Sequence, residues 1–253
     1  MTFQMIQKLI LTVVLILIII GVVGYQISLM QRQSYAEEVA YVVTLLKQAG
    51  DFIRTHTAHG GQARFGSQLQ FGVIKRVQQG MCLVRFDVGE GNIITLYQSS
   101  YSYLQYQTPH ALYGETWIFD RGDTVRAHAG TPDEADAVFH YSAGGITYVI
   151  LRTATYVAAT KTQGAVNVNV YVFQFKSPGT GGSGTFTLST QTETIIEHLR
   201  FMPSTGSTVL TLYAQTGTDA RGLPLEEQIP LPSLNPGDLV DVSVSLVTVT
   251  IAW

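Results

Sequence analysis

The first thirty residues contain a nearly unbroken hydrophobic segment. No charged residue stands between Lys8 and Arg32, and Thr12 is the only polar residue from Leu9 to Val23. At a rise of about 1.5 Å per residue, a helix over 9–30 is long enough to cross a hydrocarbon layer of about 30 Å. The pattern predicts a helix that lies either in a membrane or among other apolar helices.

Helical periodicity continues beyond this segment. Apolar residues recur three and four positions apart, whereas charged residues such as Glu38, Asp51 and Arg54 are assigned to the other faces. This stripe predicts an amphipathic helix that packs on the rest of the chain. The residues expected in that contact are Val39, Val42, Val43, Leu46, Phe52 and Ile53.

The two patterns predict one continuous helix over about 4–57. No proline occurs before Pro109, and Gly60-Gly61 supplies a stop signal. Such a helix is roughly 80 Å long, far more than a bilayer requires. We therefore divide it into a hydrophobic part at about 9–30 and an amphipathic part at about 31–57.

From Phe71 onward the pattern changes to short segments with a period of two. The valines from Val166 to Val172 alternate with polar or aromatic residues, so one face of this strand belongs in a core. The fold class expected is α+β, with a helical part at 1–59 and an antiparallel β-sandwich, Ig-like or Greek-key, at 60–253. The expected strands are 71–77, 81–87, 92–98, 146–158, 165–175, 185–190, 207–215 and 239–252.

Three segments carry finer predictions. In the last strand the apolar positions are even-numbered from Val240 to Val244 and odd-numbered from Val247 to Trp253, which predicts a bulge, a strong twist or a change of partner near Leu246. The prolines of 223–236 exclude a central strand and favour an extended edge or a connecting arm. The segment 192–202 fits either a strand or a short helix.

The composition excludes some classes of function and of covalent structure. Charged residues make up 13% of the chain and the net charge is −3, so there is no basic field and no nucleic-acid partner is predicted. The single cysteine, Cys82, excludes an internal disulfide. Its apolar neighbours favour a small buried residue over a nucleophile.

No local catalytic template is present. The chain lacks Gly-x-Ser-x-Gly, Gly-x-x-x-x-Gly-Lys, His-Glu-x-x-His and paired cysteines. We therefore predict a protein that is not an enzyme, with no catalytic residues, cofactor or metal.

Three polar groups offer weaker candidates. His56 and His59 have a spacing that suits zinc but lack a third ligand, so a solvated helix end is favoured. Arg121-Gly122-Asp123 matches an adhesion tripeptide, although a polar turn is favoured. The acidic cluster of Asp133, Glu134 and Asp136 lacks a calcium-loop pattern, so a solvated turn is favoured.

The order of these segments resembles the type IV pilin superfamily, particularly its archaeal pilin and archaellin branch. Leu9–Met30 corresponds to the hydrophobic half of the pilin helix, Gln31–Thr57 to the half that packs on the domain, and Gly61–Trp253 to a β-domain rich in Gly, Thr and Val. The resemblance implies a structural subunit that is held in the cytoplasmic membrane before assembly. The hydrophobic helices of identical subunits then bundle at the centre of a helical filament on the cell surface.

The residues that would pack in the filament core share this hydrophobic segment. Gly21 and Gly24 either let neighbouring helices approach closely or mark a local unwinding. The full set is Leu9, Val13, Leu17, Ile20, Gly21, Gly24 and Ile27.

Other functions fit the same segments. In one, Leu9–Met30 stays in lipid as a single-pass anchor and the β-domain binds a ligand or a cell-envelope partner. A second is an accessory subunit of a filament, and a third reading makes the segment a cleavable secretory signal. Tyr97, Tyr101, Tyr103 and Tyr106 are suited either to recognition or to packing.

Overall fold

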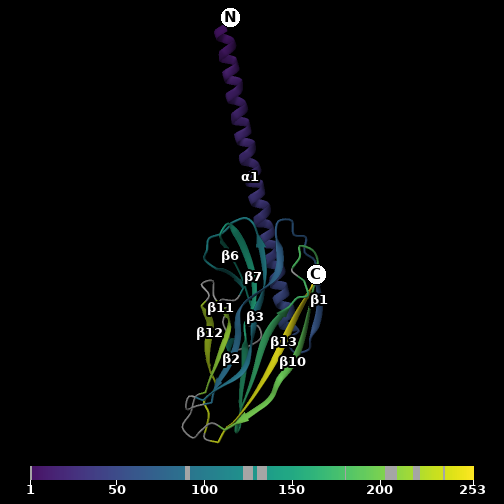
Figure 1. Cartoon of the computed structure of the whole chain (residues 1–253), viewed down its shortest axis with the longest axis vertical. Helices are drawn as coiled ribbons and strands as arrows, with labels where there is room; N and C mark the ends of the chain where they lie inside the picture. The colour runs from purple at the N-terminus through teal and green to yellow at the C-terminus, as the bar shows by residue number, and fades with distance from the viewer. Residues whose placement is uncertain are drawn as a thin grey trace.

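The chain combines one very long helix with a β-domain. The computed structural model describes residues 2–88, 92–121, 128–129, 136–179, 181–202, 210–218, 223–235 and 237–253. Helix α1 (Thr2–Thr55) comes first, and a domain built mostly of strands follows it. In Figure 1 the upper half of α1 projects away from the β-domain, whereas its lower half lies against it. The predicted long helix followed by a mostly β region is thus confirmed.

Local chemistry ends the helix. The last helical residue is Thr55, and the hydroxyl groups of Thr55 and Thr57 donate back to the carbonyls four residues earlier, at 2.8 Å in each case. The amide of Gly60 then donates to the carbonyl of His56 at 3.0 Å. Gly60 has φ of +68°, which is the left-handed conformation that glycine adopts most readily.

The described strands form two curled sheets that are mostly antiparallel. Sheet A has six strands in the order β1-β10-β13-β9-β8-β5, and sheet B has seven in the order β12-β11-β2-β3-β7-β6-β4. The strands are β1 (Gly61–Phe65), β2 (Val73–Asp87), β3 (Ile93–Thr108), β4 (Ile118–Arg121), β5 (His128–Ala129), β6 (Asp136–Ala143), β7 (Ile146–Thr153), β8 (Tyr156–Thr162), β9 (Ala165–Lys176), β10 (Phe186–Phe201), β11 (Thr211–Thr218), β12 (Pro224–Pro230) and β13 (Leu239–Ala252).

Sheet A differs from the predicted antiparallel arrangement at two strand pairs. Strands β9 and β13 pair in parallel, from Leu239 beside Ala165 to Thr250 beside Lys176. Strands β5 and β8 are parallel as well. A parallel pair needs a long crossover, and the chain between β9 and β13 supplies one because it includes β10, β11 and β12.

Several strands are longer than their sequence signals. The expected segments 71–77 and 81–87 are one strand, β2, whose register with β3 shifts beside Gly80, where φ is +76°. The ambiguous segment 192–202 is a strand, because all of it except Met202 belongs to β10. In contrast, 146–158 is divided into β7 and β8. The proline-containing strand β12 lies at an edge of sheet B, as predicted.

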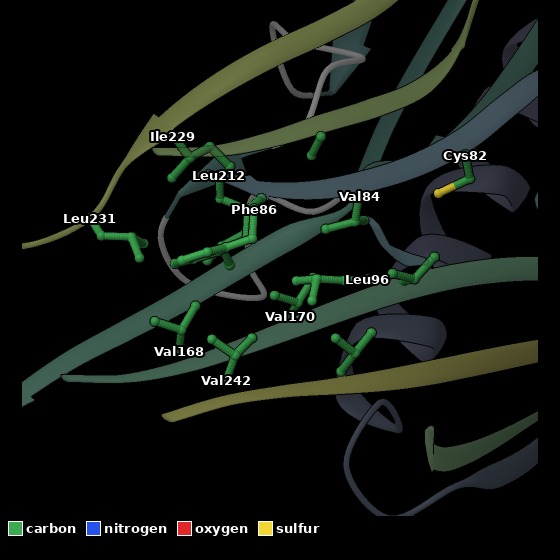
Figure 2. Packing of buried hydrophobic residues seen from close by; sticks show 14 of the residues in the cluster. Cys82, Val84, Phe86, Leu96, Val168, Val170, Leu212, Ile229, Leu231 and Val242 are labelled. Atoms are coloured by element: carbon green, nitrogen blue, oxygen red, sulfur yellow. The ribbon is translucent and has the colours of Figure 1, made fainter. Parts of the chain in front are cut away.

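The buried apolar residues form two clusters. The distal core takes side chains from both sheets, among them Val168 and Val242 of sheet A and Val84 and Phe86 of sheet B, as Figure 2 shows. The helix-side core covers one face of the lower half of α1 and includes Phe175, Val249 and Leu151.

The strands of sheet A change their buried face between these clusters. In β9, Val166 to Val172 belong to the distal core at even positions, whereas Phe173 and Phe175 belong to the helix-side core. In β13 the same exchange falls between Val244 and Val247, as its sequence parity predicts. Residues 244 and 247 lie beside 170 and 173 of β9, so both strands change face at one level of the sheet. The predicted irregularity lies in the partner strand β10, whose register shifts on both sides of Ile196, the residue opposite Val244.

Candidate assembly site

The projecting half of α1 exposes its apolar side chains to solvent. Sixteen large apolar residues between Ile10 and Met30 have exposed fractions of 42 to 69%. None of the described side chains from Gln7 to Ser34 is buried. By length and composition this helix is apolar enough to cross a membrane. A surface of this size requires either lipid or other apolar chains as its partner.

The predicted filament-core residues lie on this projecting segment. Val13, Leu17, Ile20 and Ile27 are exposed to at least half of their surface. At Gly21 and Gly24, nothing in the chain lies within 4 Å of an added Cβ atom. Leu9 lies within the helix. In the single chain the described side chains of this set are exposed and the two glycines are open, so their surfaces are free for a neighbour.

The docked half of α1 buries one stripe on the β-domain. The six residues expected in this contact are each at most 8% exposed and belong to the helix-side core: Val39, Val42, Val43, Leu46, Phe52 and Ile53. Leu45 and Ala49 are buried beside them. The helix packs against β6, β7 and β1, and its core cluster takes side chains from both sheets. The apolar contact alone therefore joins α1 to much of the domain.

Glu38 anchors the upper end of this contact. Its carboxylate accepts hydrogen bonds from the amides of Gln70, Phe71 and Gly72 at 2.7, 3.2 and 3.1 Å, and from the hydroxyl of Tyr106 at 2.6 Å. Burial and this carboxylate raise the pKa of the Tyr106 phenol, which therefore stays a donor. A Cβ atom on Gly72 would lie 2.3 Å from the Tyr106 ring, so glycine permits the close approach.

An aromatic contact surrounds the same exit point. The ring of Tyr35 stacks on His110 with centroids 3.7 Å apart and packs edge-on against Phe71 at 4.4 Å. Tyr35 is also the first residue of α1 after the exposed segment that is partly buried. The ring of Tyr35 therefore packs on two rings of the domain at the point where the helix leaves it.

Asp136 anchors the lower end of the contact. Its side chain is 1% exposed and lies 3.4 Å from Nε of Arg54 on α1 and 3.3 Å from Nε of Arg121 on β4. Arg121 also donates to the carbonyl of Lys47 at 2.9 Å and to the carboxylate of Asp51 at 2.8 Å. A solvated turn was favoured for Asp136, and this is wrong because two arginines and the helix cover it.

The helix comes closest to sheet B at Gly50. A Cβ atom there would lie 2.2 Å from Oδ2 of Asp136 and 3.4 Å from Cδ1 of Leu151. The absence of a side chain thus lets the backbone of α1 lie directly over the buried carboxylate.

The sequence pattern predicts that Glu38 lies on a face of the helix other than the apolar stripe, and this is wrong because Glu38 is buried with that stripe. A signal was present, because Glu38 is four residues before Val42 and seven before Leu45 and therefore lies on the apolar stripe. No comparable signal exists for Asp136, since Arg54 lies far away in the chain and Arg121 belongs to a different strand.

Three tyrosines of β3 are buried packing residues, and Tyr97 is partly buried against the distal core. Tyr101, Tyr103 and Tyr106 are at most 4% exposed, and the guanidinium of the buried Arg152 lies 4.8 Å from the centre of the Tyr103 ring. Cys82 is 1% exposed, and burial raises the pKa of its thiol to about 11. This thiol is therefore a poor nucleophile.

The remaining candidates form no site among the residues that the structure describes. The His56 ring is bound to the carbonyl of Phe52 at 2.9 Å, and His59 is exposed at the helix end. Gly122, Asp123, Asp133 and Glu134 lie outside the described residues. Within the described part of the chain, no group of three His, Cys, Asp or Glu side chains is arranged to hold a metal.

The arrangement as a whole is suited to association: an exposed apolar rod is fixed to a folded domain by an apolar stripe with a carboxylate at each end. No protein-family model, curated protein or solved structure matches the chain.

Proposed function

We propose that this protein is a structural subunit of an extracellular, type IV pilus-like filament. The observation that carries the proposal is the helix that projects with apolar side chains on every face. Full burial of a large apolar side chain contributes about 1.5–3 kcal/mol, and sixteen such residues are exposed between Ile10 and Met30. Bundling of identical helices would cover this surface without any covalent link.

The docked half of α1 supports the same proposal. It is held along its length, so bundled helices would place the β-domains around them as an outer wall. The subunit would lie in the cytoplasmic membrane before assembly and on the cell surface afterwards. We also propose that the two sheets pack on each other as a two-layer sandwich, because the distal core takes side chains from both of them.

Electron microscopy of filaments sheared from cells tests the proposal, with the chain identified in the same preparation. The informative variant is Gly21→Leu, which keeps the segment apolar but fills the space at a position open in the single chain. We expect normal membrane insertion and few filaments. Ile20→Leu conserves volume at the neighbouring position and should assemble normally.

A single-pass anchor is the second candidate, favoured by the match between the apolar length and a bilayer. It predicts monomers that are recovered only from detergent-solubilised membranes, with Gly21→Leu behaving as the wild type. Absence of filaments from sheared material, together with such monomers, would replace the filament proposal by the anchor.

A further inference from the structure

The carboxylate of Glu38 lies where the projecting segment meets the domain. Ser34 is exposed, Tyr35 is partly buried and Val39 is fully buried, so Glu38 belongs to the first turn of the docked half. The four groups that donate to it come from the loop before β2 and from β3. One side chain thus ties the neck of the helix, which is the turn around Glu38 where α1 leaves the β-domain, to two parts of the domain.

The charge of Glu38 is stabilised by dipoles. Its described partners are three consecutive backbone amides and one phenol, and no lysine or arginine of the described residues forms an ion pair with it. An ionised carboxylate accepts at both oxygens and suits four donors. A glutamine cannot replace it, because its NH₂ group is a donor and would face other donors.

Because this contact lies at the base of a long projecting segment, a small change in helix direction there moves the N-terminal end of α1 by a large distance. The segment 7–34 is about 42 Å long at 1.5 Å per residue. A tilt of about 10° at the neck moves the N-terminal end by roughly 7 Å, which approaches the 8–10 Å that separates the axes of packed helices. A small change in the direction of the helix at this point therefore suffices to misplace the apolar segment.

We propose that Glu38 is a positioning residue that fixes the direction in which the apolar segment leaves the β-domain. Asp136 sets how far the docked half lies along the domain, and Glu38 sets the exit angle. The effect on assembly rests on the proposed filament function, whereas control of the exit angle belongs to the single chain.

The test measures the exit angle in full-length monomers held in detergent. Spin labels are attached at Met30→Cys on the projecting segment and Lys176→Cys at the end of β9, both exposed positions, while the buried Cys82 stays unlabelled. In Glu38→Gln we expect the distribution of distances between the labels to broaden. The matched control is Glu37→Gln, which removes an exposed charge one residue away and should leave the distribution unchanged.

Hydrogen exchange separates a local effect from general destabilisation. In Glu38→Gln the amides of Gln70, Phe71 and Gly72 should exchange at least about tenfold faster, because each loses a charged acceptor. The core amides of Val170 and Val242 should keep their wild-type rates. If Glu38→Gln fails to fold, Tyr106→Phe removes one donor and should give a smaller broadening.

An unchanged distance distribution in a folded Glu38→Gln or Tyr106→Phe chain would overturn the role of Glu38. Faster exchange at Val170 and Val242 in step with 70–72 would also overturn it, since the effect would then be global. If the wild type forms no filaments, the filament proposal fails while the distances in monomers still decide the role of Glu38. If filaments form, Glu38→Gln should reduce the yield of regular ones and Glu37→Gln should not.

Discussion

Gly50 is the residue where a single methyl group matters most for the docked helix. Gly50→Ala places a Cβ atom 2.2 Å from the carboxylate of Asp136, which cannot move freely because it is buried between Arg54 and Arg121. Alanine favours a helix by about 1 kcal/mol over glycine, but the clash outweighs this gain. We expect a net loss of about 1–3 kcal/mol in the free energy of unfolding, measured by denaturant titration in detergent.

Gly24→Ala is the matched control for this prediction. It makes the same substitution in the same helix, where nothing lies within 4 Å of the added atom. It should leave the stability of the monomer unchanged or slightly higher. Equal effects at the two glycines would show that helix propensity, and not contact with Asp136, governs Gly50.

We expect Asp238 to contribute to the free energy of unfolding in a way that depends on pH. Its carboxylate accepts from the amide of Asn235 at 2.7 Å and lies 3.2 Å from Nζ of Lys161, and these contacts lower its pKa below the ordinary value of 3.8. A lowered pKa stabilises the fold above the unfolded value, and the effect is lost as pH falls through the folded value. Asp238→Asn should therefore reduce the melting temperature at neutral pH and match the wild type in strong acid.

Thermal melts over a range of pH check this prediction. Glu197→Gln serves as the control because Glu197 is an exposed acidic residue, and it should show no such dependence. A difference between Asp238→Asn and the wild type that persists at all pH values would assign the effect to packing and not to charge.

At the scale of the element, α1 has two halves with separate tasks. Leu46→Ala removes a fully buried side chain from the docked half and should lower the free energy of unfolding by about 2–5 kcal/mol. Leu17→Ala alters a side chain that is 63% exposed and should leave the monomer unaffected. Unfolding curves of the two variants check the division, which is wrong if Leu17→Ala destabilises the isolated chain.

The elements also show what sequence could predict. The long helix followed from the apolar run and from the absence of proline, and the parity change in β13 corresponds to a real exchange of buried face. Strand lengths were less accessible, because polar residues such as Gln78 and Ser102 continue a strand when its neighbours supply the pairing. The parallel pairing of β9 and β13 leaves no local signal at all.

Part of the candidate site could likewise be predicted from the sequence, and part of it could not. The apolar stripe of α1 was readable from spacing, since burial of a helix face depends on local periodicity. The two carboxylate anchors depend on groups that lie far away in the chain, such as Gln70 for Glu38 and Arg54 for Asp136. Periodicity contains no information about such partners.

At the scale of the whole molecule, filaments should be held by apolar contacts. Apolar burial is not screened by ions, and Cys82 is buried and free. We therefore expect filaments to persist in molar sodium chloride, in chelator and in reducing agent, and to dissociate in strong detergent. Sedimentation followed by microscopy measures this, and dissolution by salt alone would point to ionic contacts instead.

The direction of the docked helix bears on how the molecule carries force. The lower half of α1 runs along the long dimension of the β-domain, as most of the strands do (Figure 1). A pull on the projecting segment would thus act along the apolar stripe and load its contacts in shear. Glu38 and Asp136, at the two ends of the stripe, would both resist this sliding. The tension would then be distributed over all the contacts between α1 and the β-domain and would not break them one residue at a time.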